Sequence, residues 1–318
     1  MEPSDFEGAT VHFHNDADGC CSAAVVCARL KKFSLKAHMD PNARSLSAGK
    51  NLVLDMGGLT AEQVQGKDVT LIDHHKTEKL PCVHINPRFV GEDFPASFAC
   101  WLLFGDEKTA WIAGAGVIGD CGVMQAKPLF ELIQETNPEL VPKKIGQEEL
   151  YRSPLGTISR MVDANCSING EAAGENNVRT LISLSPAQIL AGEGPASRMK
   201  KALDERDAEI ESILGNAPEE FGRLILLRYK GGHSVKSEVA NELIRRNPDK
   251  IIMVAQEVEG HVRASLRGRD VDLSEMAKKA TEGIGVGGGH PPAAGLTVPK
   301  IRFEEVLSRI RAALEESK

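Results

Sequence analysis

The chain has 318 residues, 42% of them hydrophobic, and a formal net charge of −7, which suits a globular protein of two ordinary domains. No apolar stretch approaches the roughly 18–20 residues of a membrane span. The acidic start lacks the basic and apolar parts of a signal peptide, so we expect a cytoplasmic protein without a membrane partner. Seven cysteines without a CxxC pair argue against a disulfide framework and a thiolate zinc site.

The acidic surplus lies before residue 196, and the sequence shows no basic tail or stripe of the kind that binds long duplexes. Aromatic residues make up only 4% of the chain, too few for an extended base-stacking platform. A polyanionic partner would therefore have to be attracted by metal ions or by a local arginine cluster.

The first hundred residues alternate short apolar strands with helical stretches. A strand at 10–14 leads into a small-residue helix at 20–32. Apolar strands that alternate with helices form parallel sheets covered on both faces, so we predict an α/β domain with a mostly parallel sheet flanked by helices. Its further strands are predicted at 36–39, 51–55, 69–73 and 83–86.

The pattern turns helical from residue 95 to about 184, and turn residues loosen the chain at 185–194. A smaller α/β unit follows, with a glycine-rich loop at 285–295. Its predicted strands lie at 224–229, 251–258 and 261–266, and its helices at 237–246, 273–282 and 303–316. We therefore divide the chain into a first domain at 1–185, a helical linker at 186–220 that includes a charged helix at 198–214, and a second domain at 221–318.

Acidic residues and histidines gather where apolar runs end. Residues 14–19 read HNDADG after the first strand, Asp55 ends the strand at 51–55, and residues 73–75 read DHH. Asp120, in GVIGDCG, also follows an apolar run. Ligand sites of α/β sheets lie at the carboxyl ends of the strands, so we expect these side chains to converge there.

Each motif also has a simpler explanation. HNDADG fits a cap before a helix starting at Cys20, Asp55 or Asp120 alone fits a turn, and DHH fits a polar loop. In a continuing strand, His74 and His75 would point to opposite faces. Together, however, the carboxylates would repel one another unless cations compensate them. Oxygen-rich ligands with few imidazoles suit Mn²⁺, with Mg²⁺ or Co²⁺ as substitutes.

The chain carries the motifs HNDADG, LDMGG, DHH and GD in this order, followed by SLRG at 265–268 and GVGGGHPPAAG at 285–295. This set of motifs resembles the DHH phosphoesterase superfamily, in the branch that carries a DHHA1 domain. This branch includes RecJ exonucleases, NrnA-type oligoribonucleases and short archaeal-type single-strand exonucleases such as the Hjm-associated nuclease. The resemblance covers nearly the whole chain. It implies that the first domain is catalytic and that the DHHA1 domain binds substrate.

The resemblance also implies a centre of two metal ions that share Asp55. It gives catalytic roles to His75, which would face the substrate phosphate as a donor or acid, and to Asp73, which would orient a histidine or join the metal network. Two such ions can activate a water and stabilise the entering and leaving oxygens at phosphorus. The implied ligands are His14, Asp16 and Asp55 for one ion, and Asp18, Asp55, His74 and Asp120 for the other.

The DHHA1 domain would hold the nucleotide. Glycines can let backbone amides approach a phosphate or base closely, and Arg267 can hold a phosphate in a bidentate contact. Arg263 and Arg269, at period-two spacing, either share that face or are solvated. The implied substrate-binding residues are Arg267, Gly287, Gly288, Gly289 and His290.

We therefore expect a metal-dependent phosphodiesterase, foremost a single-strand-specific exonuclease that releases mononucleotides from short DNA or RNA, with 3′-to-5′ digestion favoured by resemblance to the short archaeal enzymes. Hydrolysis of small substrates of the NrnA type stays open: pApA, cyclic dinucleotides or 3′-phosphoadenosine 5′-phosphate. A non-catalytic scaffold in replication or repair is the third alternative, although no implied ligand is missing. A repair or replication helicase is the expected kind of protein partner.

Overall fold

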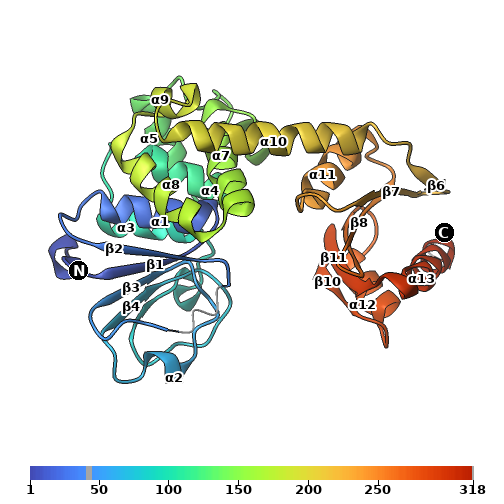
Figure 1. The fold of residues 1–318 in the computed structure, drawn as a ribbon, viewed down its shortest axis with the longest axis horizontal. Coiled ribbons are helices and arrows are strands. Elements are labelled where there is room, and N and C mark those ends of the chain that lie inside the picture. Colours follow the sequence, from blue (N-terminus) through green and yellow to red (C-terminus); the bar gives the residue numbers. More distant parts are fainter. Residues whose placement is uncertain (41–44, 317–318) are drawn as a thin grey trace. The chain divides into compact units, whose positions relative to one another are not determined.

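The computed structural model describes residues 1–40 and 45–316. It divides into two compact units, Met1–Leu203 and Asp204–Lys318 (Figure 1), and the division falls inside the predicted linker. Each unit contains one sheet with its own apolar core, as separate domains do. Among the described residues, no helix combines the length and the apolar composition that crossing a membrane requires.

Five strands form the sheet of the first unit, and all four neighbouring pairs are parallel. The predicted parallel sheet is confirmed. Because the strands run in one direction, the residues that follow β1, β3 and β4 emerge at one edge. In spatial order the strands are β2 (Ser34–His38), β1 (Thr10–His14), β3 (Asn51–Leu54), β4 (Val69–Ile72) and β5 (Val83–Ile85).

One face of this sheet carries most of the apolar core, including Val11 and Phe13, and most of the helices lie on that side (Figure 1). The other face carries a smaller cluster around Val53 and Leu71 and the one-turn helix α2 (Ala61–Val64). Helices therefore cover the two faces unequally. Those packed into the larger core are α1 (Ala17–Cys27), α3 (Ala96–Phe104), α4 (Ala110–Gly119), α7 (Pro154–Asn169) and α8 (Glu171–Ser183).

The segment predicted as a turn-rich break at 185–194 is helical over most of its length, and its turn is confined to the residues after α9. Ser185 caps α9 (Pro186–Ala191) by accepting a hydrogen bond from the Gln188 amide at 3.4 Å, and α10 (Ala196–Leu214) follows. The cap and Pro186 in the first turn favour a helix despite the flanking glycines. The other short elements of this unit are η1 (Pro3–Phe6), η2 (Pro87–Val90), α5 (Lys127–Thr136) and α6 (Gln147–Tyr151).

Helix α1 begins at Ala17, three residues before the predicted start. Asp16 caps it, because its Oδ1 accepts a hydrogen bond from the Gly19 amide at 2.9 Å. Gly19 is required for a steric reason: a Cβ there would lie 2.1 Å from the carbonyl oxygen of His14. The capped turn therefore presses α1 against the end of β1, and Asp18 lies in the first turn of a helix rather than in an extended segment.

The second unit contains a six-stranded mixed sheet. β7 and β8 are parallel, and the other four neighbouring pairs are antiparallel. The predicted glycine-rich loop at 285–295 is instead a hairpin of β10 and β11, in which Gly288 pairs with Gly295. In spatial order the strands are β10 (Val286–His290), β11 (Ala293–Pro299), β9 (His261–Arg267), β8 (Ile251–Val258), β7 (Leu224–Lys230) and β6 (Glu219–Phe221).

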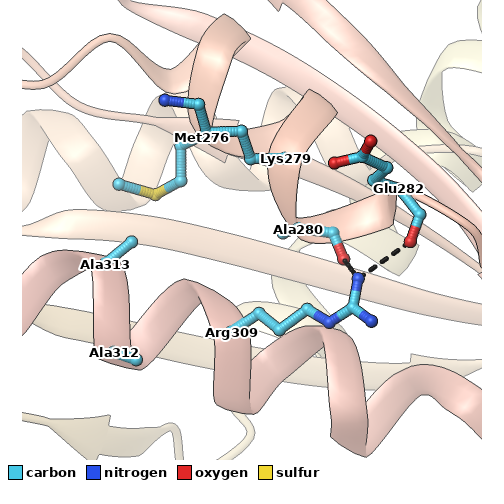
Figure 2. A pocket seen from close by; sticks show the side chains of 7 residues that line it. All are labelled: Met276, Lys279, Ala280, Glu282, Arg309, Ala312 and Ala313. Atoms are coloured by element: carbon cyan, nitrogen blue, oxygen red, sulfur yellow. Dashed lines mark hydrogen bonds between the residues drawn. The ribbon is translucent and has the colours of Figure 1, made fainter.

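Helices cover both faces of this second sheet. α11 (Lys236–Arg246) packs on one face, and α12 (Leu273–Thr281) and α13 (Phe303–Glu316) pack on the other; η3 (Lys300–Arg302) precedes α13. Arg309 joins the last two helices: its Nη1 donates to the carbonyl oxygens of Ala280 at 3.2 Å and Glu282 at 2.9 Å (Figure 2). A cation thus caps the carboxyl end of α12.

Candidate metal centre

Three neighbouring strands deliver most of the centre. His14 ends β1, Asp55 follows β3, and residues 73–75 follow β4. β3 lies between β1 and β4 in the sheet, so Asp55 lies between the other two groups. This local arrangement follows from the parallel sheet, as predicted.

Asp120 does not follow a strand, and that part of the prediction is wrong. The apolar run before it forms helix α4, and Asp120 is the residue at the carboxyl end of that helix. The run AWIAGAGVIG is long enough for nearly three helical turns and buries its small residues against α1 and α3. Asp120 therefore reaches the same centre from the helical layer above the sheet.

The predicted ligands come together in one place. His14 Nδ1 lies 2.6 Å from Asp16 Oδ2 and 3.8 Å from Asp55 Oδ2. On the other side, His74 Nε2 lies 3.3 Å from Asp55 Oδ1 and 3.5 Å from Asp120 Oδ2. Three groups have ligand atoms within 4.8 Å of one another and could hold a cation: His14/Asp16/Asp55, Asp18/His74/Asp120 and Asp55/His74/His75.

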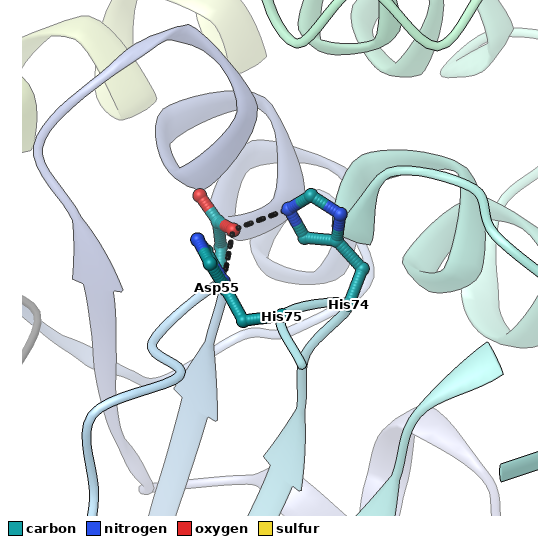
Figure 3. Close-up of side chains that lie close together, drawn as sticks. All are labelled: Asp55, His74 and His75. Carbon is teal, nitrogen blue, oxygen red and sulfur yellow. Dashed lines mark ion pairs between the residues drawn. The ribbon is translucent and has the colours of Figure 1, made fainter. Parts of the chain in front are cut away.

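Both histidines of DHH approach the same carboxylate. β4 ends at Ile72, so the alternation of a strand no longer separates His74 from His75. His74 Nε2 and His75 Nδ1 lie 3.3 Å and 3.8 Å from Asp55 Oδ1, respectively (Figure 3). The turn after β4 therefore brings two imidazoles to one oxygen.

Asp73 belongs to none of the three groups and contacts His75. Its side chain is fully buried, and its Oδ1 lies 2.8 Å from His75 Nδ1. Its Oδ2 accepts a hydrogen bond from the His75 amide at 3.2 Å. The hydrogen bond to Asp73 also raises the pKa of His75. Asp73 is thus placed to fix the orientation of the His75 ring.

Asp55 combines backbone strain with an unsatisfied side chain. Its φ of 57° lies in the left-handed region, which a residue other than glycine adopts at some cost. Its side chain is only 2% exposed, and Oδ1 accepts no hydrogen bond. His74 Nε2 faces this oxygen at 3.3 Å only as an ion-pair partner. A buried carboxylate oxygen that accepts no well-aligned hydrogen bond is energetically unfavourable, and a bound cation would satisfy it. The residues present therefore fit a divalent ion.

The two imidazoles among the predicted ligands hold protons strongly. Burial alone would lower the pKa of His14, but the neighbouring carboxylates of Asp16 and Asp55 raise the pKa to about 10. For His74, Asp55 and the other nearby carboxylates likewise outweigh burial and raise the pKa to about 10. Each proton supplies positive charge next to the carboxylates, as a bound cation would.

Two carboxylates of the centre have raised pKa values, because negative charge is concentrated around them. Burial, with the nearby charges of Asp55 and Asp120, raises the pKa of Asp18 well above its usual range. Burial also raises the pKa of Asp120, to about 6. Concentrated negative charge in a buried site is costly without positive charge, and a divalent cation would remove this penalty.

Asp18 is held by the amino end of helix α3. Its Oδ2 accepts a hydrogen bond from the Ala96 amide at 2.8 Å, and its Oδ1 accepts one from the Ser97 amide at 3.0 Å and another from the Ser97 hydroxyl. A helix amino end favours a carboxylate. No pattern in the sequence points to Ser97, because the contact joins segments that lie 79 residues apart.

Two further residues that the sequence analysis missed hold the DHH turn. Asn86 Nδ2 donates to the carbonyl oxygen of His75 at 2.9 Å, and Arg88 Nε donates to that of His74 at 2.7 Å. Asn86 Oδ1 also accepts a hydrogen bond from the Arg88 amide. The polar residues of INPR, directly after β5, are the only signal that could have pointed to them.

The predicted substrate-binding residues lie in the second unit. Arg267 ends β9, where its Nε donates to Asn241 Oδ1 at 2.7 Å. The other four residues belong to β10, an edge strand. Their role in binding a nucleotide remains a prediction. They are Gly287, Gly288, Gly289 and His290.

The second unit matches a known domain family. Residues 228–316 match the DHHA1 domain. A comparison with curated protein sequences gave no match.

Solved structures share the fold of the whole chain. RecJ from Thermus thermophilus in complex with Mn²⁺ is 18% identical, with a TM-score of 0.70, over 98% of this chain and 53% of that one, so the chain spans about half of its length. An exonuclease RecJ bound to manganese is 17% identical (TM-score 0.62; 98% and 90% covered). A pGpG-specific phosphodiesterase, PggH from Vibrio cholerae, is 12% identical (TM-score 0.55; 98% and 100% covered).

The fold and the site define an α/β protein that gathers acids and imidazoles at one edge of a parallel sheet and carries a second, mixed-sheet unit. With the match to the DHHA1 domain and the RecJ-like fold, this is the architecture of the DHH–DHHA1 phosphoesterase superfamily. The predicted resemblance to that superfamily is confirmed.

Proposed function

We propose that the protein is a divalent-metal-dependent phosphodiesterase, foremost an exonuclease that releases mononucleotides from short single-stranded DNA or RNA. The observation that carries the proposal is the position of Asp55. Its two oxygens face different partners: Oδ2 faces His14, and Oδ1 faces His74. A carboxylate between two ligand groups is what a two-ion centre needs.

The proposed ligands are those of the sequence prediction. His14, Asp16 and Asp55 would hold one ion, and Asp18, Asp55, His74 and Asp120 the other. The mixture of carboxylates and imidazoles favours Mn²⁺, with Mg²⁺ or Co²⁺ as substitutes. When bound, such ions supply an activated water and stabilise charge on the phosphate.

His75 would act on the substrate itself. Its side chain is 47% exposed, unlike the other residues of the DHH turn, so a ligand can reach it. Because Nδ1 faces Asp73, Nε2 is the nitrogen that can donate a proton or a hydrogen bond to a phosphate oxygen. Asp73 would act through His75 by fixing the ring.

Hydrolysis of a dinucleotide is the second candidate. Similarity to the pGpG-specific phosphodiesterase over the full length of that protein supports this candidate. The complete set of proposed ligands argues against a scaffold, since a protein without ions has no physical reason to keep clustered carboxylates. Cytoplasmic location, 3′-to-5′ polarity and a helicase partner stay predictions.

One experiment tests these proposals together. A single-stranded oligonucleotide of DNA and one of RNA, labelled at either end in separate reactions, and a labelled dinucleotide are incubated with Mn²⁺ and resolved on a gel. We expect mononucleotide release, with an early labelled mononucleotide only from the 3′-labelled strand. Cleavage restricted to a dinucleotide would favour the second candidate. No hydrolysis of any of these substrates would refute the proposed activity.

Gly57→Ala tests the position of His75. A Cβ on Gly57 would lie 2.3 Å from His75 Cβ and 2.7 Å from its Cγ, so the ring must move. Misplacing a catalytic group by an ångström can lower the rate about 10²-fold, and we expect a fall of this size in kcat. Steady-state kinetics measures it, with Gly49→Ala as the matched control, because nothing lies within 4 Å of a Cβ at that position. Equal kcat values for both variants would contradict the role of His75.

Metal binding should release protons. His14 and His74 have pKa values of about 10 without ions, and each must lose its proton to become a ligand. Apparent Mn²⁺ affinity should therefore rise with pH, by about one to two powers of ten per pH unit between roughly pH 6.5 and 8.5. Calorimetric titrations in buffers of different ionisation enthalpy count the protons. An affinity that is constant over this range would contradict the assignment.

A further inference from the structure

A row of very small residues crosses three strands of the second sheet. Gly288 in β10 lies opposite Gly295 in β11, and Gly295 lies opposite Ser265 in β9. Opposite residues share a face. Ser265 Oγ lies 3.0 Å from Ser237 Oγ of helix α11, so the row lies on the α11 side of the sheet. We call Gly288, Gly295 and Ser265 the glycine row.

The two glycines of this row are not explained by packing. A Cβ on Gly288 would approach nothing closer than Lys278 Cε at 3.8 Å, and one on Gly295 nothing closer than the Ala264 carbonyl oxygen at 3.6 Å. Gly287, by contrast, has no room, since its Cβ would lie 2.4 Å from the Ala277 carbonyl oxygen. Glycine weakens a strand and often marks the close approach of a ligand. Ser265 is buried against α11, so the two glycines are the part of the row that offers bare backbone to a flat group.

Cationic or titratable residues flank the row on both sides. On one side, Arg267 of β9 pairs with Ala293 of β11, and Ala293 pairs with His290 of β10. Arg267 and His290 therefore lie at the same end of the row. On the other side lies Arg263, which shares the face of Ser265 and Arg267 because the three are two residues apart. Arg263 and Arg267 are separated by about 13 Å along the strand, a distance that exceeds one nucleotide step.

Arg263 has a second cation beside it. Lys236 precedes Ser237 in α11, and burial and the charge of Arg263 lower its pKa, with Glu238 opposing them. Glu238 lies 3.7 Å from Arg206. Within the described part of the chain, neither Lys236 nor Arg263 has an ion pair, although Lys236 Nζ donates to Ser234 Oγ at 2.6 Å. Glu238 is thus the nearby acid, and the two cations beside the row favour an anionic ligand.

We propose that Lys236 and Arg263 bind a backbone phosphate of an extended single-stranded oligonucleotide, across the glycine row from Arg267 and His290. This inference rests on the proposed function and deepens it. A dinucleotide is too short to reach both ends of the row, whereas a pentanucleotide is long enough. The second phosphate contact would make the protein prefer oligonucleotides over dinucleotides.

Binding without hydrolysis tests the inference. Fluorescence anisotropy with EDTA present measures the affinity of the full chain for a labelled pentanucleotide and a labelled dinucleotide. In the double variant Lys236→Gln/Arg263→Gln, we expect the preference for the pentanucleotide to fall about tenfold and the salt dependence of its binding to weaken by about 0.7 in log–log slope, the value for one phosphate contact on a single strand. Lys279→Gln is the matched control, because Lys279 lies on α12 at the opposite face and is 74% exposed.

The outcomes distinguish this inference from the proposed function. An equal loss of affinity for both lengths, no loss for either, or an unchanged salt slope would overturn the second phosphate contact. A circular dichroism spectrum that matches wild type excludes unfolding, and both substituted side chains are at least partly exposed. Failure of the wild-type protein to hydrolyse any substrate would refute the proposed function instead, because binding in EDTA does not depend on catalysis.

Discussion

Replacing Asp55 by asparagine should abolish both Mn²⁺ binding at the centre and phosphodiester hydrolysis. Asp55 is the residue that His14 and His74 approach from opposite sides, so its loss weakens both proposed ion sites at once. Asparagine is the appropriate replacement because it tolerates the left-handed backbone found here, with φ of 57°. We expect kcat to fall by about 10³-fold or more, since both ions contribute to stabilising the transition state.

Calorimetry for Mn²⁺ and steady-state kinetics measure the two effects of Asp55→Asn on the same sample. The thermal midpoint adds a third measurement: Mn²⁺ should raise Tm of the wild type, by mass action on the folded state, and should leave the variant nearly unchanged. Asp249→Asn, in an exposed turn, is the matched control. A variant that still binds two Mn²⁺ ions tightly would show that Asp55 does not join two sites.

Replacing His75 by alanine should separate catalysis from metal binding. His75 is the exposed histidine of the turn, and Asp73 holds its Nδ1 at 2.8 Å, so we assign it to the substrate and not to an ion. Loss of a general acid lowers kcat by about 10²- to 10⁴-fold. Mn²⁺ affinity should change little, because the six proposed ligands remain.

Asp73→Asn distinguishes an effect of Asp73 through the His75 ring from a purely structural role of Asp73. The hydrogen bond to Asp73 raises the pKa of His75, so its loss should move the basic limb of the pH–kcat profile to lower pH, in addition to lowering kcat. In His75→Ala, that limb should disappear. If His75→Ala lowers Mn²⁺ affinity as much as His74→Ala does, His75 is a ligand and the assignment to substrate is wrong.

The sequence predicted the part of the centre that depends on local order along the chain. β1, β3 and β4 are short apolar runs. β1 ends in His14, and β3 and β4 are followed at once by Asp55 and the DHH turn, so all three lead directly into the centre. In a parallel sheet the carboxyl ends of neighbouring strands must meet, so the pattern of strands was enough to bring these side chains together.

The prediction failed in two places. Asp120 lies in the stretch predicted to be helical, yet it was grouped with residues at strand ends because an apolar run precedes it too; that run is helix α4, packed on α1 and α3. The glycines at 285–295 looked like a loop because glycine disfavours strands. Pairing of β10 with β11 and packing on α12 override that preference.

The kinds of ligand, their order and the sheet edge at which they gather follow from residue chemistry and from neighbours along the chain, so the sequence alone specifies them. Three features depend instead on tertiary packing: Asp120 approaches from a helix, the amino end of α3 holds Asp18, and both histidines of the turn face Asp55. The first two join segments far apart in sequence, as Asp18 and Ser97 do across 79 residues. Such contacts form only when the helices pack on the sheet, and the local sequence pattern does not determine which helix ends then lie beside which strands.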